Sequence, residues 1–279
     1  MKIISEFPVI NNRNIHVRVY NPEQEKTIVC WHGLARNGFD FQTIAALLSQ
    51  KYRVLCPDTL GRGLSQWAND PAKEYNYPNY VSIALGICKY FNVKELDWIG
   101  TSMGGIIGII LASGPLKDQI QRLIINDIGP EIPDNALQRI IDYVSGVQPE
   151  FDNLIEYENY LKELYLIMGE RTDEQWFQMT STSLRRKDNG RFTVHFDPDI
   201  IQISDETVPA IDLWELFEKV ECELMLLHGF LSDVLTTNIV KKMKFIKQKM
   251  KVLTIPDCGH APGLHLNNHN DPILKFLLR

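Results

Sequence analysis

The sequence predicts an α/β fold built on a mostly parallel, doubly wound sheet, and three observations lead to this class. Short apolar runs alternate with longer segments of helical periodicity. A glycine-rich turn joins one of these runs directly to a helix-like segment. The alternation then stops between about residues 132 and 216, where the chain is helix-rich, charged and aromatic. We therefore expect a core of residues 1–131 and 217–279, with residues 132–216 inserted as a helical cap.

The core elements are expected in a regular order. The runs 2–7 and 14–20 are typical of an antiparallel hairpin at the leading edge. The run Thr27–Trp31 (TIVCW) has the composition of a buried strand, and the apolar residues of 41–48 after it recur at helical spacing. Further strands are expected over 53–56, 96–99, 122–126, 224–227 and Lys251–Ile255, and a helix over 79–91.

Size, composition and charge narrow the class of protein. A chain of 279 residues can bury about 75% of its unfolded surface, which is enough for a self-sufficient core. A content of 44% hydrophobic and 23% charged residues is that of an ordinary soluble globular protein. The net charge of −6 argues against a nucleic-acid partner and against binding to an anionic membrane surface.

The cysteines and the apolar runs bear on the compartment. The five cysteines are odd in number, and two of them lie in strand-like runs, so we expect buried free thiols. The longest strongly apolar run, 106–112, is too short to insert into a membrane. The N-terminus shows no signal-peptide pattern. These features predict a cytoplasmic protein.

A candidate nucleophile lies in the segment 100–105 (GTSMGG). It matches the G-x-S-x-G elbow, in which the serine occupies a strained turn from a strand into a helix. Larger side chains at Gly100 and Gly104 would collide with the neighbouring strand and helix. The start of the following helix directs backbone N–H groups at charge that develops beside Ser102.

His260 is the candidate general base. A serine hydroxyl needs a base, and histidine is the residue whose pKa lies near working pH. His260 follows the last apolar strand, at the sheet edge where the elbow lies. His265 and His269 lie further into polar sequence, where we expect them to be exposed. His228 ends a strand beside a glycine and is expected to be structural.

Two aspartates are candidates for the acid that orients the imidazole. Asp233 follows the strand-like run 224–227, which gives the chain order Ser102, Asp233, His260 typical of one large hydrolase class. Asp127 follows another core strand and also lies at the correct edge of the sheet. We favour Asp233, because Asp127 precedes a sharp turn that its carboxylate could stabilise.

The oxyanion hole is expected to consist of two backbone N–H groups. Leu34 lies in the loop after the strand Thr27–Trp31, and Met103 follows the nucleophile. The side chain of His32 is then expected to be a structural hydrogen-bonding group. Arg36 and Asn37 are expected to be solvated loop residues. The tryptophans expected to pack in the core rather than line the pocket are Trp67, Trp176 and Trp214.

Five segments together resemble the α/β-hydrolase superfamily, and the resemblance covers nearly the whole core. The nearest resemblance is to small bacterial carboxylesterases, enol-lactonases, cofactor-free haloperoxidase-like enzymes and meta-cleavage product hydrolases. Ser102 distinguishes this chain from the branch of the superfamily whose nucleophile is an aspartate. The HGGG-type oxyanion motif is absent, because Leu34 follows Gly33. The segments are CWHGLARN (30–37), DTLGRGLS (58–65), GTSMGG (100–105), LLHGFLSDVL (226–235) and GHAP (259–262).

These observations predict a serine hydrolase, specifically a carboxylesterase. Ser102 would attack a carboxylic ester or lactone of a small to medium molecule, His260 would move the proton, and water would release the acid. No metal and no organic cofactor is expected, because no metal-binding sequence cluster is present. Two alternatives stay open: hydrolysis of a C–C bond of meta-cleavage type, and a catalytically silent module that only binds a ligand.

Overall fold

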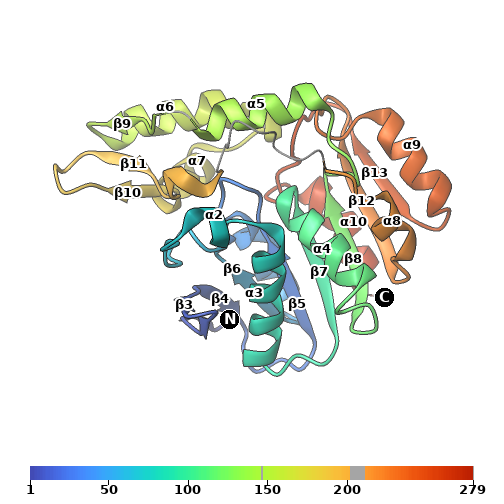
Figure 1. The fold of residues 1–279 in the computed structure, drawn as a ribbon. Coiled ribbons are helices and arrows are strands. Elements are labelled where there is room, and N and C mark those ends of the chain that lie inside the picture. Colours follow the sequence, from blue (N-terminus) through green and yellow to red (C-terminus); the bar gives the residue numbers. More distant parts are fainter. Residues whose placement is uncertain (146, 202–210, 279) are drawn as a thin grey trace.

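An eight-stranded sheet organises the chain in the computed structural model, which describes residues 1–145, 147–201 and 211–278 (Figure 1). At one edge, the outermost strand pairs antiparallel with the second strand, and the second pairs antiparallel with the third. The third to eighth strands are parallel to one another. This arrangement confirms the predicted fold class. In spatial order the strands are β1 (Ile3–Glu6), β4 (Val17–Tyr20), β6 (Arg53–Pro57), β5 (Thr27–Trp31), β7 (Leu96–Thr101), β8 (Ile120–Asn126), β12 (Glu223–Gly229) and β13 (Lys251–Ile255).

Helices cover both faces of the sheet, because its central strands are apolar on both sides. In β5, Val29 and Trp31 pack into one core cluster, and Ile28 and Cys30 pack into the other. The alternation follows from the two-residue period of a strand. The first cluster contains α3 (Tyr77–Tyr90), α4 (Met103–Ser113), α8 (Trp214–Lys219) and α9 (Thr237–Ile246); the second contains α1 (Gln42–Leu48) and α10 (Asn267–Leu277).

Short elements connect this framework. A small hairpin between β1 and β4, one 3-10 turn and a one-turn helix lie outside the eight-stranded sheet. All five cysteines are free and four of them are buried, as expected. No described helix is long and apolar enough to cross a membrane. The short elements are β2 (Val9–Ile10), β3 (Arg13–Asn14), η1 (Gly38–Phe41) and α2 (Pro71–Glu74).

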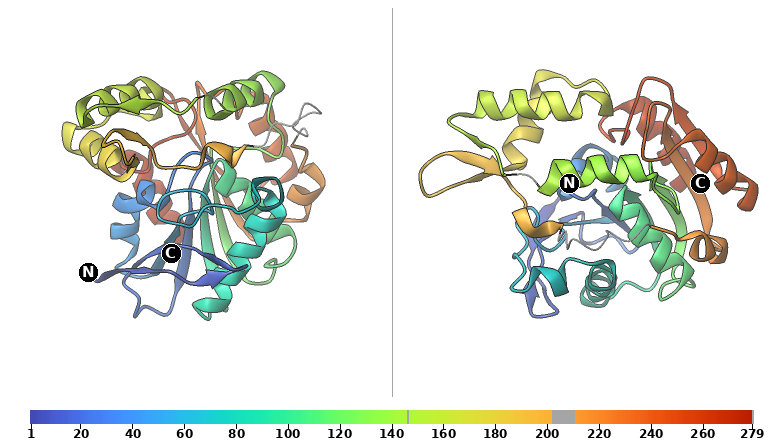
Figure 2. Two further views of the ribbon diagram at one scale, coloured as in Figure 1. Left: turned by 60° about the vertical axis from the view of Figure 1, so that its left-hand side comes forward. Right: turned by 45° about the horizontal axis from the view of Figure 1, so that its top comes forward.

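The described residues of the cap segment (132–216) lie over the carboxyl ends of the parallel strands (Figures 1 and 2). Helices make up most of the segment's described elements, as expected, and three short strands that the sequence did not predict form an antiparallel sheet in the order β10-β11-β9. The helices are α5 (Asp134–Ser145), α6 (Leu154–Tyr165) and α7 (Asp173–Thr182), with η2 (Leu166–Met168) and η3 (Pro198–Ile200). The strands are β9 (Glu150–Phe151), β10 (Leu184–Arg186) and β11 (Phe192–Val194).

The chain leaves the core and returns to it at one place. Glu131 and Asp212 form an antiparallel bridge. The N–H of Leu213 donates to the carbonyl of Pro130 at 2.7 Å, and the indole of Trp214 donates to Glu131 at 2.7 Å. The ends of the cap segment are thus joined within a few residues of the expected boundaries. The division into a core domain and a cap domain stays a prediction.

Candidate active site

Ser102 occupies the predicted elbow between β7 and α4. Its φ of 51° and ψ of −116° place a non-glycine residue in a strained conformation. The flanking glycines are required sterically: a Cβ on Gly100 would lie 2.1 Å from the carbonyl oxygen of Gly104, and a Cβ on Gly104 would lie 2.1 Å from that of Trp31. The elbow therefore has the cause predicted from the sequence.

His260 reaches this serine from the loop after β13. Its Nε2 lies 3.0 Å from the Oγ of Ser102, which is hydrogen-bond distance. The His260 side chain is 16% exposed, so it is shielded by protein but can still exchange a proton with a bound molecule. The structure thus brings together the two residues that the sequence predicts as nucleophile and base.

Asp127 is the carboxylate that faces the other nitrogen of this histidine. Its Oδ2 lies 2.9 Å from Nδ1 of His260, and its Oδ1 accepts a 2.7 Å hydrogen bond from the N–H of Gly229. The residue is fully buried and has a φ of 56°. Both oxygens therefore have fixed partners, and the carboxylate can hold the imidazole in the tautomer with hydrogen on Nδ1.

Asp233, which the sequence favoured, is bound elsewhere. Its carboxylate accepts two hydrogen bonds, at 2.7 and 2.8 Å, from the guanidinium of Arg139 in α5. Burial opposes ionisation of Asp233, but the hydrogen bond and the charge of Arg139 lower the pKa of this carboxyl overall. The prediction of Asp233 as the orienting acid is therefore corrected to Asp127.

The correction has a topological reason. Chain order does not give strand order, and in the sheet β8 lies directly beside the nucleophile's strand β7, whereas β12 is one strand further away. Asp127 follows β8 immediately, while Asp233 lies four residues beyond the end of β12. The backbone confirms the proximity of the former, because Ser102 N–H donates to the carbonyl of Asn126 at 2.9 Å.

Two backbone N–H groups are available beside the serine. Met103 is the first residue of α4, where an N–H has no partner within the helix. The N–H of Leu34 makes no hydrogen bond to any other described residue, and a Cβ on Gly33 would lie 3.6 Å from the Cβ of Ser102. The pair retains the arrangement expected of an oxyanion hole, and this role stays a prediction.

His32 supports the loop that carries Leu34. The imidazole is fully buried. Its Nδ1 lies 2.6 Å from the carbonyl of Gly33, so it donates there, and its Nε2 accepts from the N–H of Thr59 at 2.8 Å. Burial lowers the pKa of His32 to about 4, so this ring stays neutral near pH 7. The predicted structural role of His32 is confirmed.

The remaining histidines differ from expectation in one respect. His269 is 2% exposed and hydrogen-bonds the carbonyl of Gly263 at 2.7 Å. His265 is half-buried against the cap segment, where its Nε2 lies 2.8 Å from the carbonyl of Glu170. The expectation that both are exposed is wrong, because the polar sequence around them begins a helix that packs on the core. His228 is buried in β12, as predicted.

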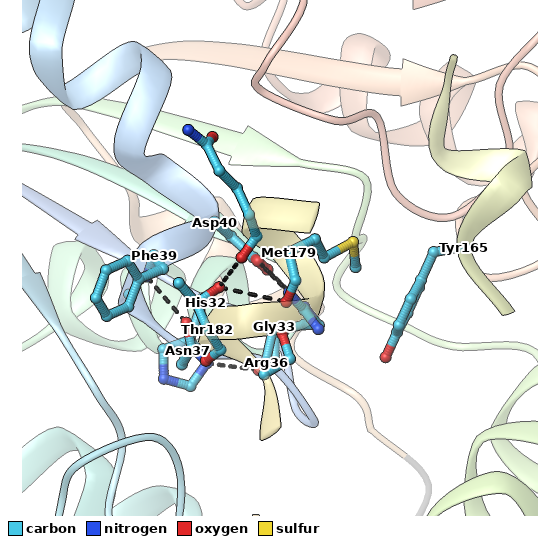
Figure 3. Close-up of polar contacts among 12 residues, drawn as sticks. His32, Gly33, Arg36, Asn37, Phe39, Asp40, Tyr165, Met179 and Thr182 are labelled. Carbon is cyan, nitrogen blue, oxygen red and sulfur yellow. Dashed lines mark hydrogen bonds and ion pairs between the residues drawn. The ribbon is translucent and has the colours of Figure 1, made fainter. Parts of the chain in front are cut away.

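A charged cluster lies where the loop that carries Leu34 meets the cap segment (Figure 3). Arg36 forms a bidentate pair with Asp40, with Nε 2.9 Å from Oδ2, and stacks 5.0 Å from the ring of Tyr165. Asn37 donates to the carbonyl of Thr182 at 2.8 Å. The expectation that Arg36 and Asn37 are solvated is wrong, since both are buried under the cap segment.

This cluster has fixed ionisation states. Burial disfavours charge on Asp40, yet the adjacent Arg36 lowers the pKa of the carboxyl overall. Conversely, burial disfavours charge on Arg36, but the carboxylate of Asp40 raises the pKa of the guanidinium further. The two therefore form a permanent ion pair beside the site. Among the described residues, no group of three or more His, Cys, Asp or Glu side chains could hold a metal ion.

The comparisons with known proteins identify the family to which this fold belongs. The model of the alpha/beta hydrolase family matches residues 28–273, which is most of the chain. The chain is an alpha/beta hydrolase. A crystal structure of an alpha/beta hydrolase from Novosphingobium aromaticivorans superposes on this hydrolase with a TM-score of 0.89 at 27% identity, over 99% of this chain and 98% of that one.

Two relatives with named activities are similar to this hydrolase to different extents. The 3-hydroxybutyrate-oligomer hydrolase of Cupriavidus necator is 35% identical over 91% of this chain and 90% of its own length. The 2-hydroxymuconate semialdehyde hydrolase of a Pseudomonas species is 30% identical, but over only 37% of this chain and 35% of its own length. The first resemblance extends through the cap segment, and the second does not span the chain.

Proposed function

We propose that this hydrolase cleaves a carboxylic ester through a covalent acyl-enzyme formed on Ser102. The observation that carries the proposal is the unbroken chain of hydrogen bonds from Ser102 Oγ through His260 to the buried Asp127, at 3.0 and 2.9 Å. A hydroxyl next to a base, with the base oriented by a third group, is the arrangement that activates a serine.

The steps follow from this geometry. His260 Nε2 takes the hydroxyl proton of Ser102 while the Oγ of Ser102 attacks the ester carbonyl. Asp127 stabilises the imidazolium that forms. The N–H groups of Leu34 and Met103 would donate to the oxyanion of the tetrahedral intermediate. His260 then returns the proton to the leaving alcohol. In the second half-reaction water attacks the acyl-enzyme carbonyl while His260 takes its proton, and the acid is released from Ser102.

The substrate class we propose is a linear ester of a short hydroxy acid. The support is the relative from Cupriavidus necator, whose name records hydrolysis of oligomers of 3-hydroxybutyrate and which matches this chain over nine-tenths of its length. Lactones belong to the same reaction class, since ring opening forms the same acyl-enzyme. The C–C hydrolysis left open by the sequence has weaker support, because the matching relative covers about a third of the chain.

The test is a substrate panel on the wild-type protein and Ser102→Ala. We expect turnover of 4-nitrophenyl esters of short acyl chains and of a 3-hydroxybutyrate dimer, measured by release of 4-nitrophenol and of free acid. We expect no turnover of a vinylogous diketone. Cleavage of the diketone without cleavage of any ester would replace this proposal by the C–C hydrolase. Failure of all substrates, together with no labelling by a fluorophosphonate, would favour a silent binding module.

A further inference from the structure

A small cavity lies between α7, η1 and the loop that follows His260, and its lining includes Thr101, the residue before the proposed nucleophile, but not Ser102 or His260 themselves. Its volume is about 80 Å³, room for two or three water molecules at roughly 30 Å³ each. A whole ligand pocket typically measures about 300–1,000 Å³, so this cavity can hold only one end group of a substrate. Its walls include Asp40, Thr101, Arg171, Gln175 and Gly263.

Arg171 is a cation in this wall that forms no ion pair with any other residue the structure describes. Its guanidinium donates to the carbonyls of Gly169 at 3.2 Å and Tyr165 at 3.4 Å and lies 4.9 Å from the ring of Trp176. No described carboxylate comes within 4.0 Å of it. Arg171 is partly buried, and this burial lowers its pKa to about 10 although the charge of Asp40 acts in the opposite direction.

Two cations near the cavity share one anion, although only Asp40 and Arg171 line the cavity itself. Arg36 and Arg171 are cations and Asp40 is the anion near them, and Asp40 is already held by both its oxygens on Arg36 (Figure 3). The uncompensated charge is therefore that of Arg171. Two uncharged polar residues of α7, Gln175 and Gln178, line the same cavity.

Two residues of the cavity wall lie next to the reacting residues along the chain. Thr101 in its wall directly precedes Ser102, so their Cα atoms are about 3.8 Å apart, and Gly263 is the third residue after His260. We propose that Arg171 and the cavity beside it form a subsite for a carboxylate of the substrate, which makes this hydrolase selective for esters that carry a free acid group. The inference rests on the ester hydrolysis proposed above.

Arg171 also binds two backbone carbonyls, so a purely structural role must be distinguished by the test. The variants are Arg171→Gln, which removes the charge, and Arg171→Lys, which keeps it. Arg185→Gln is a matched control, because Arg185 also lies in the cap segment and stacks on a tryptophan, 4.6 Å from the ring of Trp67, but does not line the cavity. A structural role would change the hydrolysis of charged and neutral esters alike.

The kinetic arm compares hydrogen 4-nitrophenyl esters of dicarboxylic acids, in a series of spacer lengths, with neutral 4-nitrophenyl esters of matched length. We expect the wild type to prefer the charged ester at one spacer length. Arg171→Gln should lower the ratio of kcat/KM for charged over neutral ester by roughly tenfold to a hundredfold, mostly through KM. Arg171→Lys should restore part of it, and Arg185→Gln should leave it unchanged. A ratio unaffected by Arg171→Gln would overturn the proposal.

The binding arm does not depend on catalysis. Butyrate and its uncharged analogue butyramide are titrated calorimetrically into the wild type and Arg171→Gln at constant ionic strength, because salt screens the charge. We expect only the wild type to bind butyrate and neither protein to bind butyramide measurably. Butyrate binding without ester turnover would retain the subsite and reject the proposed function. Ester turnover with equal butyrate binding by both proteins, or by neither, would reject the subsite alone.

Discussion

Asp127→Asn is the substitution that examines the orienting acid with least disturbance of the fold. Asparagine has the same shape and tolerates the φ of 56° found here. Its amide oxygen can still accept from the N–H of Gly229, which lies 2.7 Å from Oδ1. The NH₂ group then faces Nδ1 of His260, 2.9 Å away. A donor there forces the hydrogen onto Nε2, and the imidazole can no longer take the proton of Ser102.

The expected loss in kcat is on the order of ten-thousandfold, the effect of placing a catalytic histidine in the wrong tautomer. Stability should change by no more than about 1–2 kcal/mol, because the buried N–H of Gly229 keeps an acceptor. The assay is steady-state hydrolysis of a 4-nitrophenyl ester, with urea unfolding of the same samples to confirm the fold.

Asp233→Asn is the control for this experiment. It weakens an ion pair with Arg139 whose side chains are 41% and 54% exposed, and such pairs contribute at most about 1 kcal/mol. We expect its kcat to stay within about tenfold of wild type. If Asp127→Asn kept a tenth or more of the wild-type kcat while Asp233→Asn lost activity, the assignment of the acid would be refuted and the sequence-based choice reinstated.

Two further predictions concern stability. In Gly104→Ala the new Cβ would lie 2.1 Å from the carbonyl oxygen of Trp31, so β5 must shift and the free energy of unfolding should fall by about 3 kcal/mol or more. The control is Gly190→Ala, whose Cβ meets no atom within 4 Å and whose free energy of unfolding should fall by only about 1 kcal/mol because of the positive φ. Equal losses in the two variants would contradict this reasoning. Burial lowers the pKa of His32 to about 4 and of His195 to about 3, whereas the unfolded chain takes up these protons near pH 6.5. Stability is therefore complete above about pH 6.5 and should fall by about 2 kcal/mol per histidine between pH 7 and pH 5. Burial also lowers the pKa of His265 to about 4 and that of His269, so His195→Gln should remove at most about a third of the loss measured by urea unfolding at several pH values. An unchanged pH dependence in that variant would contradict the buried, neutral state of His195.

The sequence was informative wherever the cause of a structure is local. A strand such as Thr27–Trp31 is apolar throughout because it is covered on both faces, and the elbow at Ser102 needs glycines because of close backbone contacts within a few residues or on the neighbouring strand. Those features were predicted, together with the position of His260. Each is set by composition, by periodicity or by steric demands that a short motif displays.

The features that the sequence did not reveal depend on which distant segments meet. Asp127 and Asp233 each follow a core strand, and only the lateral order of β8 and β12 decides which one faces His260. The burial of Arg36 depends on Tyr165, 129 positions along the chain, which covers it from the cap segment. Arg171 was not predicted because nothing in its local sequence distinguishes an unpaired cation in a cavity wall from a solvated one.

The central claim is that Ser102 is the nucleophile of a charge-stabilised triad. Its most direct test is intact-mass measurement after reaction with a fluorophosphonate, with peptide mapping of the adduct, on the wild type, Ser102→Ala and Asp127→Asn. The account predicts one adduct per wild-type chain, located on Ser102, none on Ser102→Ala, and much slower labelling of Asp127→Asn. Full labelling of folded Ser102→Ala, or an adduct mapped to another residue of the wild type, would contradict it.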